Sequence, residues 1–253
     1  MTRSTIALLV IILATAATPA RARAADSPGK TRPQAEIQIA VCAPADQIVR
    51  ALDLHPGGAP IEVWLFDDAS LTLFGRGLRL RLRVANDHSQ LTLKAADQDC
   101  ARLDPELVPT GEGKCEYDIY ANSSAGAVSL NLSLGAKRTN DLLSGRVTPG
   151  QVLSPSQVRY LRDIVAIWPL PPGIRRLGPM QVRTYHTKGK RYDIDITQLP
   201  HGERYAEISR KVPLAEATRA MQVMEADLSR AGVEMCSDQS SQAVNKLRAL
   251  LRQ

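Results

Sequence analysis

Strict two-residue alternation of charged and apolar side chains is the feature of this sequence that most restricts its fold. In the segment GRGLRLRLRV, Arg79, Arg81 and Arg83 alternate with leucines. Successive side chains of a β-strand point to opposite faces, whereas a helix would spread these residues around its axis. The segment is therefore predicted to be a strand with three like charges on one face. Their mutual repulsion is unfavourable unless water or a polyanion compensates it.

The same alternation recurs in other short segments of the chain. Lys94 follows the alternating segment LTL. Polar or charged residues also share one strand face, with mainly apolar residues between them, in three further groups: Lys114, Glu116 and Asp118; Asp193 and Asp195; and Glu207, Ser209 and Lys211. A sheet with one face in water accounts for this pattern. A closed barrel with a polar interior and an exterior covered by helices accounts for it equally well. Such an interior is costly when dry, so it would hold water, a metal or a polyphosphate.

The order of the segments predicts an α+β fold. Strands are expected at 36–42, 61–67, 77–85, 89–95, 114–121, 180–188, 190–197 and 203–212, and the segment GAVSLNLSL at 126–134 fits a strand or a short helix. Helices are expected at 43–54, 154–168, 213–232 and 241–253. We therefore expect about eight mostly antiparallel strands in a sheet that could close into a barrel, with helices packed on it.

The N-terminus has the features of an export signal. Arg3 precedes an apolar run at 6–17, and Ala22-Arg23-Ala24 fits a signal-peptidase site. The run is short for a membrane span, although an uncleaved anchor is the alternative. We expect a signal peptide at 1–24, a linker at 25–34 and one domain at 35–253, in a periplasmic or secreted protein with no stable membrane span after cleavage.

Charge and cysteines add two constraints. The precursor has a net charge of +6, and residues 1–24 contain three arginines and no acid, which leaves +3. So mild a charge gives no argument for a nucleic-acid partner. Four cysteines in an exported chain indicate two disulfides, for which three connectivities exist. We favour Cys100–Cys115, which closes a Gly/Pro-rich excursion, and Cys42–Cys236, which pins the C-terminal region to the first strand; the ligand spacing disfavours zinc.

Several of these segments together resemble a known family. The order EIQIAV, WLFDDASLTLFGRGLRLRLR, LTLK, KCEYDI, YDIDIT, YAEISRKV and SSQAVNKL is similar to the CYTH domain of triphosphate tunnel metalloenzymes, over roughly residues 35–250. The resemblance implies a tunnel barrel that holds phosphate oxygens through Arg81, Arg83, Lys94 and Lys211, with Arg183 as a further contact. It also implies Mg²⁺ or Mn²⁺ ligands at Glu36, Glu116, Asp195 and Glu207. Arg79 is predicted to lie on the same strand face as Arg81 and Arg83, so we include it among the phosphate contacts.

The sequence departs from the family pattern mainly among the expected metal ligands. Gln38 and Ala40 stand where the family has a glutamate and a lysine, and Ser209 stands where a second late glutamate is expected. The Ser-Lys motif near the C-terminus is loosened to SSQAVNKL. The arginine and lysine side of the pattern is therefore better preserved than the metal side. Loss of a charged ligand typically removes orders of magnitude of rate, whereas the remaining cations can still hold an anion.

Three functions follow as hypotheses. The first is a barrel that binds a phosphorylated small molecule or polyphosphate, with impaired metal-dependent catalysis. The second is an active divalent-metal-dependent triphosphate hydrolase. The third is a structural or protein-interaction module, in which the charged residues of the lumen pair with one another. The third hypothesis can be distinguished from the other two by whether the arginine face lines an open tunnel or pairs fully with Glu116, Asp118 and Asp195.

Overall fold

The computed structural model describes residues 33–86, 88–100, 106, 111–121, 123–239 and 243–251. The expected signal peptide and nearly all of the expected linker lie outside these residues. One sheet contains β1 (Gln34–Val41), β2 (His55–Pro56), β3 (Ile61–Asp67), β4 (Leu78–Val84), β5 (Ser89–Ala95), β6 (Gly113–Tyr120), β7 (Ser123–Leu134), β8 (Arg175–His186), β9 (Asp193–Gln198) and β10 (Arg204–Pro213).

Nine of these strands close into a barrel. The strand order is β2-β8-β3-β4-β5-β7-β6-β1-β10-β9, and a further pairing of β8 with β9 completes the ring, so that β2 lies outside it. The pairing of β1 with β6 is parallel, and the other pairings between these strands are antiparallel. The predicted α+β class and mostly antiparallel barrel are confirmed. The barrel has one strand more than the eight expected, because the segment at 126–134 is a strand that pairs with both β5 and β6.

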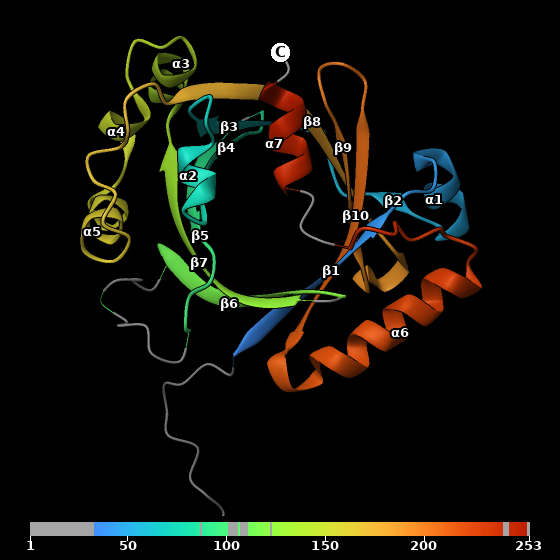
Figure 1. Cartoon of the computed structure of the whole chain (residues 1–253). Coiled ribbons are helices and arrows are strands. Elements are labelled where there is room, and N and C mark those ends of the chain that lie inside the picture. The colour runs from blue at the N-terminus through green and yellow to red at the C-terminus, as the bar shows by residue number, and fades with distance from the viewer. Residues whose placement is uncertain are drawn as a thin grey trace, which may run out of the picture. The chain divides into compact units, whose positions relative to one another are not determined.

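Helices cover the outer face of much of the barrel (Figure 1). The helices of the described residues are α1 (Ala45–Ala51), α2 (Thr72–Gly75), α3 (Ala136–Leu143), α4 (Pro149–Val152), α5 (Pro155–Asp163), α6 (Ala217–Arg230) and α7 (Ala243–Leu251), with 3-10 turns at Lys188–Lys190 and Leu214–Glu216. Of these, α7 lies within the ring of strands (Figure 1). One apolar cluster joins β1, β9 and β10 to α1 and α6. A second joins β4, β5 and β7 to α3, α4 and α5. The outward-facing apolar residues of the strands are therefore buried under helices, and the charged residues are left to face the lumen.

β8 and α5 are two of the elements whose bounds differ from the sequence expectation. β8 begins at Arg175 rather than at residue 180, although Pro179 cannot donate a strand hydrogen bond. The strand accommodates it because the pairing with β3 shifts register between Val63 and Leu65. Ser154 caps α5 as its sequence suggests, with Oγ accepting from the Gln157 backbone N–H at 3.2 Å. That helix ends at Asp163 instead of 168, and Ala166 adopts a left-handed φ of 55°.

Both expected disulfides are present. Cys100–Cys115 and Cys42–Cys236 have Cα–Cα separations of 5.5 Å and 4.9 Å. Two disulfides fit an oxidising compartment. No helix in the described part of the chain combines the length and apolar character that crossing a membrane requires.

Candidate functional site

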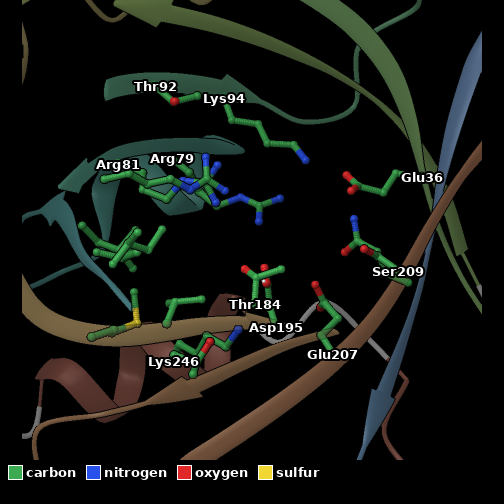
Figure 2. A pocket seen from close by; sticks show the side chains of 18 residues that line it. Glu36, Arg79, Arg81, Thr92, Lys94, Thr184, Asp195, Glu207, Ser209 and Lys246 are labelled. Atoms are coloured by element: carbon green, nitrogen blue, oxygen red, sulfur yellow. Dashed lines mark hydrogen bonds between the residues drawn. The ribbon is translucent and has the colours of Figure 1, made fainter. Parts of the chain in front are cut away.

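Inward-facing side chains of the barrel surround a cavity of about 280 Å³. Three groups form its walls. The cationic wall is Arg79, Arg81 and Arg83 of β4 with Lys94 of β5, and the acidic wall is Glu36 of β1, Asp195 of β9 and Glu207 of β10. Figure 2 shows Arg79, Arg81 and Lys94 on one side of the cavity and Glu36 and Glu207 on the other. The apolar wall is Ile61, Val63 and Leu65 of β3 with Met180 and Val182 of β8.

The cationic wall follows from the alternation of β4. Leu78, Leu80 and Leu82 are buried on the outer face, so the three arginines must project into the lumen. The pairing with β5 sets Arg79 opposite Lys94 and Arg81 opposite Thr92. Burial lowers the pKa of Arg81 well below its ordinary value, and the charges of Arg83 and Arg79 lower it further. The wall therefore concentrates positive charge in a poorly solvated place.

The arginines of this wall form no ion pair with neighbouring carboxylates of the described chain, although the charges of Asp195 and Glu36 favour the charged forms of Arg81 and Arg83. Among the ion pairs formed between described residues, none includes Arg79, Arg81 or Arg83. The carboxylates that could have paired with them have other partners: Asp118 lies 2.5 Å from Lys94 Nζ, and Asp195 Oδ1 accepts a 2.5 Å hydrogen bond from Thr184 Oγ1. The arginine face lines an open cavity, which counts against a lumen that is fully satisfied by its own salt bridges.

The acidic wall brings together carboxylates from distant parts of the chain. Glu207 lies opposite Asp195 in the β9–β10 pairing, and Glu36 lies on β1, the other neighbour of β10. Burial raises the pKa of Glu207, and Asp195 and Glu36 act in the same direction against the opposing effect of Lys246. A cation placed between these carboxylates would relieve their repulsion.

Strand alternation places Glu116 and Lys211 on the inward face of the barrel, but neither residue lines the cavity. They form a lysine–glutamate cluster in which Glu116 pairs with Lys114 and with Lys211, whose Nζ lies 3.2 Å from Glu116 Oε1. Burial opposes ionisation of Glu116, but the two lysines outweigh it and lower its pKa. Glu116 is thus a counter-ion for lysines and, unlike the other three expected metal ligands, does not line the cavity.

Arg183 lies outside the cavity altogether. It is exposed on β8, between Val182 and Thr184, both of which line the cavity. Neighbouring residues of a strand face opposite sides, so Arg183 points outward. We therefore leave it out of the site.

Lys246 lines the cavity and was absent from the sequence-based list of site residues. It comes from α7, and Figure 2 shows it on the same side as Asp195. Burial lowers the pKa of Lys246, while the charges of Glu207 and Asp195 oppose that shift. The one sequence signal was the loosened SSQAVNKL motif, which contains this lysine. Gln38 and Ser209 also line the cavity, at positions where the resemblance would have placed carboxylates.

The donor set does not form a ready-made metal centre. Within the described ranges, no three His, Cys, Asp or Glu side chains are grouped so that they could hold a metal ion. Glu36, Asp195 and Glu207 are the carboxylates that line the cavity. One or two of them could hold Mg²⁺ jointly with phosphate oxygens, which is how Mg²⁺ is usually bound. They do not fit a metal site built from protein ligands alone.

Comparison with known proteins agrees with the barrel. No protein-family model and no curated protein sequence matches this chain. A Hippeastrum protein described as a candidate adenylyl cyclase with a dominant triphosphatase activity superposes with a TM-score of 0.57 at 16% identity, over 84% of this chain and 95% of that one. A candidate adenylate cyclase of Bacillus halodurans superposes with a TM-score of 0.56 at 13% identity, over 83% and 97%. This chain therefore has the CYTH-like tunnel fold that its sequence predicted.

Proposed function

We propose that this protein is an exported tunnel barrel that binds a polyphosphate-type anion, such as triphosphate or inorganic polyphosphate, and that its metal-dependent catalysis is impaired. One observation carries the proposal: three arginines of β4 face the cavity, and no carboxylate in the described part of the chain pairs with them. Like charges held together in a protein interior are unfavourable, so a site of this kind is best explained by an anion that binds there.

The chemistry of the wall suits a chain of phosphates. A guanidinium group is a planar fork that can donate two hydrogen bonds to phosphate oxygens. Alternate residues of a strand lie roughly 6.5 Å apart, so an anion with several phosphate groups can contact more than one arginine at once. A cavity of 280 Å³ is at the small end of ligand sites. The proposed partner is accordingly a compact phosphorylated molecule or a segment of polyphosphate, and not a nucleic acid.

Export is part of the proposal. Two disulfides are compatible with an oxidising compartment, and the sequence before the barrel has the features of a signal peptide at 1–24 followed by a linker at 25–34. We propose a periplasmic or secreted protein whose barrel domain begins at about residue 35. N-terminal sequencing of protein from the exported fraction tests the cleavage. A mature chain that begins at Met1 would contradict it.

Calorimetric titration with tripolyphosphate at low salt tests the anion site. We expect saturable binding to the wild type and at least about tenfold weaker binding to Arg83→Gln, since hydrogen bonds to charged groups contribute about 1.5–3 kcal/mol. Arg183→Gln is the matched control, because it removes the same charge from the outer face of the barrel. Absence of binding to a folded wild type would reject the proposal, as would equal loss in both variants.

The second candidate function is a divalent-metal-dependent triphosphate hydrolase. It is favoured by the acidic wall, which faces the cationic wall across the cavity. Mg²⁺ or Mn²⁺ held by Glu36, Asp195 or Glu207 would neutralise phosphate charge and assist attack by water. It ranks second because Gln38 and Ser209 supply no carboxylate where the resemblance implies a glutamate.

Phosphate release from tripolyphosphate, with and without Mn²⁺, separates the two candidate functions. The hydrolase requires metal-stimulated release that Glu207→Gln reduces by at least about hundredfold. Glu234→Gln is the control, because Glu234 is exposed and does not line the cavity. Binding without metal-stimulated release would instead support the anion-binding barrel.

A further inference from the structure

Two neighbouring strands of the barrel, β3 and β8, turn apolar side chains toward the lumen. On β8 the polar residues Gln181 and Arg183 are exposed on the outer face, whereas Met180 and Val182 are buried and line the cavity. β3 likewise contributes only aliphatic side chains to the cavity lining. This is the reverse of β4, whose leucines face outward and whose arginines face inward. The apolar wall therefore needs an explanation of its own.

Packing of helix α7 accounts for part of the apolar wall. Leu247 and Leu250 of this helix are buried in one apolar cluster with Val63 and Met180. All five residues of the apolar wall nevertheless line the cavity. Had the wall served only to seat the helix, the helix would separate it from the cavity. Some of its aliphatic surface is therefore available to a ligand.

Strand register places the apolar wall directly beside the arginines. In the β3–β4 pairing Val63 lies opposite Arg83 and Leu65 lies opposite Arg81. In the β3–β8 pairing Val63 lies opposite Met180. Residues directly opposite one another share a face of the sheet, with Cβ atoms about 4.5–5.5 Å apart. A phosphate held by Arg83 therefore has the Val63 side chain as its next neighbour and Met180 beyond it.

The composition of the lining favours a saturated carbon chain over a flat ring. None of the described residues that line the cavity is aromatic. A nucleobase gains affinity by stacking on aromatic side chains, and this lining offers it no such partner. A saturated chain needs only apolar surface that excludes water, which valine, leucine, isoleucine and methionine provide. A cavity of about 280 Å³ is at the small end of ligand sites and limits the chain to a few carbons.

We propose that the ligand of this barrel is a short aliphatic ester of di- or triphosphate, with its phosphates on the β4 arginines and its saturated chain on the apolar wall. The inference rests on the proposed anion-binding function and narrows its ligand. Val63 is the residue that selects the chain, because it lies between Arg83 and Met180 in the sheet. Inorganic phosphates would fill only the charged part of the cavity.

Calorimetric titration of the full mature chain with a series of diphosphates tests this inference. The probes are methyl diphosphate, 3-methylbutyl diphosphate and adenosine diphosphate, with tripolyphosphate as the inorganic reference. Each methylene removed from water is worth about fourfold in affinity. We therefore expect 3-methylbutyl diphosphate to bind at least about tenfold more tightly than methyl diphosphate, since even partial burial of four further carbons gives that gain. Adenosine diphosphate should bind no more tightly than methyl diphosphate.

Val63→Thr tests the wall itself, because it keeps the shape of the side chain and replaces a methyl with a hydroxyl. It should reduce the affinity ratio of 3-methylbutyl to methyl diphosphate by at least about threefold. Val128→Thr is the matched control: Val128 of β7 is equally buried, but it packs under the outer helices and does not line the cavity. It should leave the ratio unchanged. A purely structural role of Val63 would weaken both ligands alike and also leave the ratio unchanged.

The outcomes separate this inference from the proposed function. Equal binding of the methyl and 3-methylbutyl esters by a wild type that binds tripolyphosphate would overturn the aliphatic ligand but leave the anion site standing. Tightest binding of adenosine diphosphate, or the same ratio in Val63→Thr and the wild type, would also overturn it. Absence of binding of every phosphate, tripolyphosphate included, would remove the proposed function itself. If Val63→Thr does not fold, the comparison of the esters on the wild type still decides.

Discussion

The cationic and acidic walls face one another across the same cavity, yet they are assembled in different ways. Three arginines of the cationic wall come from β4 and its lysine from the next strand, β5, so the wall is local in sequence. The acidic wall takes one carboxylate from each of β1, β9 and β10, which are brought together by barrel closure. A local wall tolerates change elsewhere in the chain, whereas a wall assembled from distant strands depends on the whole fold.

The walls also differ in how their charges are balanced. The β4 arginines have no ion-pair partner among the described residues, and burial together with crowding lowers the pKa of Arg81. On the acidic wall, Asp195 accepts a hydrogen bond from Thr184, and Lys246 lies in the same cavity. Each wall is thus compensated only in part: on the cationic wall Lys94 pairs with Asp118, and the β4 arginines are left without an ion pair to any described carboxylate.

The largest effect is expected from the centre of the cationic wall. Arg81→Gln should weaken tripolyphosphate binding by about hundredfold, because it removes a guanidinium fork from a poorly solvated site. It should also raise the melting temperature of the anion-free protein, since repulsion from Arg79 and Arg83 is relieved. Titration and thermal melting check both parts. Weaker binding together with a lower melting temperature would mean that Arg81 serves the fold and would break the comparison.

Neutralising the acidic wall should act in the opposite direction. Asp195→Asn keeps an acceptor for Thr184 and removes one negative charge from the cavity. We expect tripolyphosphate to bind about three- to tenfold more tightly in EDTA, because the wall repels the anion less. If titration shows weaker binding instead, the carboxylate assists the anion, and the two walls act together rather than in opposition.

A smaller effect on anion affinity is expected for Glu116, which lies on the inward face of its strand but belongs to neither wall. Glu116→Gln should change anion affinity by no more than about threefold, because its carboxylate pairs with Lys114 and Lys211 outside the cavity lining. The same titration measures it, with Arg81→Gln as the contrasting variant. A loss of tenfold or more would extend the functional site to the lysine–glutamate cluster.

The smallest effect concerns stability and pH. Burial raises the pKa of Glu207, so the folded chain holds this proton more tightly than the unfolded chain does. The associated stability is present at low pH and is lost as pH rises through the folded-state pKa. Glu207→Gln should therefore melt a few degrees above the wild type at pH 7.5 and show a smaller difference at pH 4. An equal difference at both values would show that ionisation of Glu207 is not responsible.

Period-two alternation made most strands and the shared face of the cationic wall predictable, whereas the closed tunnel was implied by the resemblance to the CYTH domain. Because Arg79, Arg81 and Arg83 alternate with leucines, one face of this strand is charged at any position in the sheet. The segment at 126–134 was ambiguous because leucine, serine and alanine fit a strand or a helix. Its pairing with a strand on each side decides in favour of β7.

Alternation alone could not predict how far along the tunnel a side chain lies, or where helix α7 docks. Parity assigns Glu116 and Glu207 alike to the lumen, but the position of each along the barrel depends on the register of every strand around the ring. Lys246 lies on a helix, and its entry into the cavity depends on the apolar wall of two strands far away in sequence. Such placement is a property of the assembled barrel, and the loosened SSQAVNKL motif is its one trace in the sequence.

The Cys42–Cys236 disulfide has a consequence for survival in an environment rich in proteases. It joins residues 194 positions apart, so the intervening chain forms a covalent ring that contains every barrel strand except β1. A single peptide bond cut anywhere in that ring leaves both fragments linked. The N-terminal strand and the C-terminal helix therefore stay attached to each other after one cleavage in a surface connection, and a nicked molecule can keep its tunnel closed.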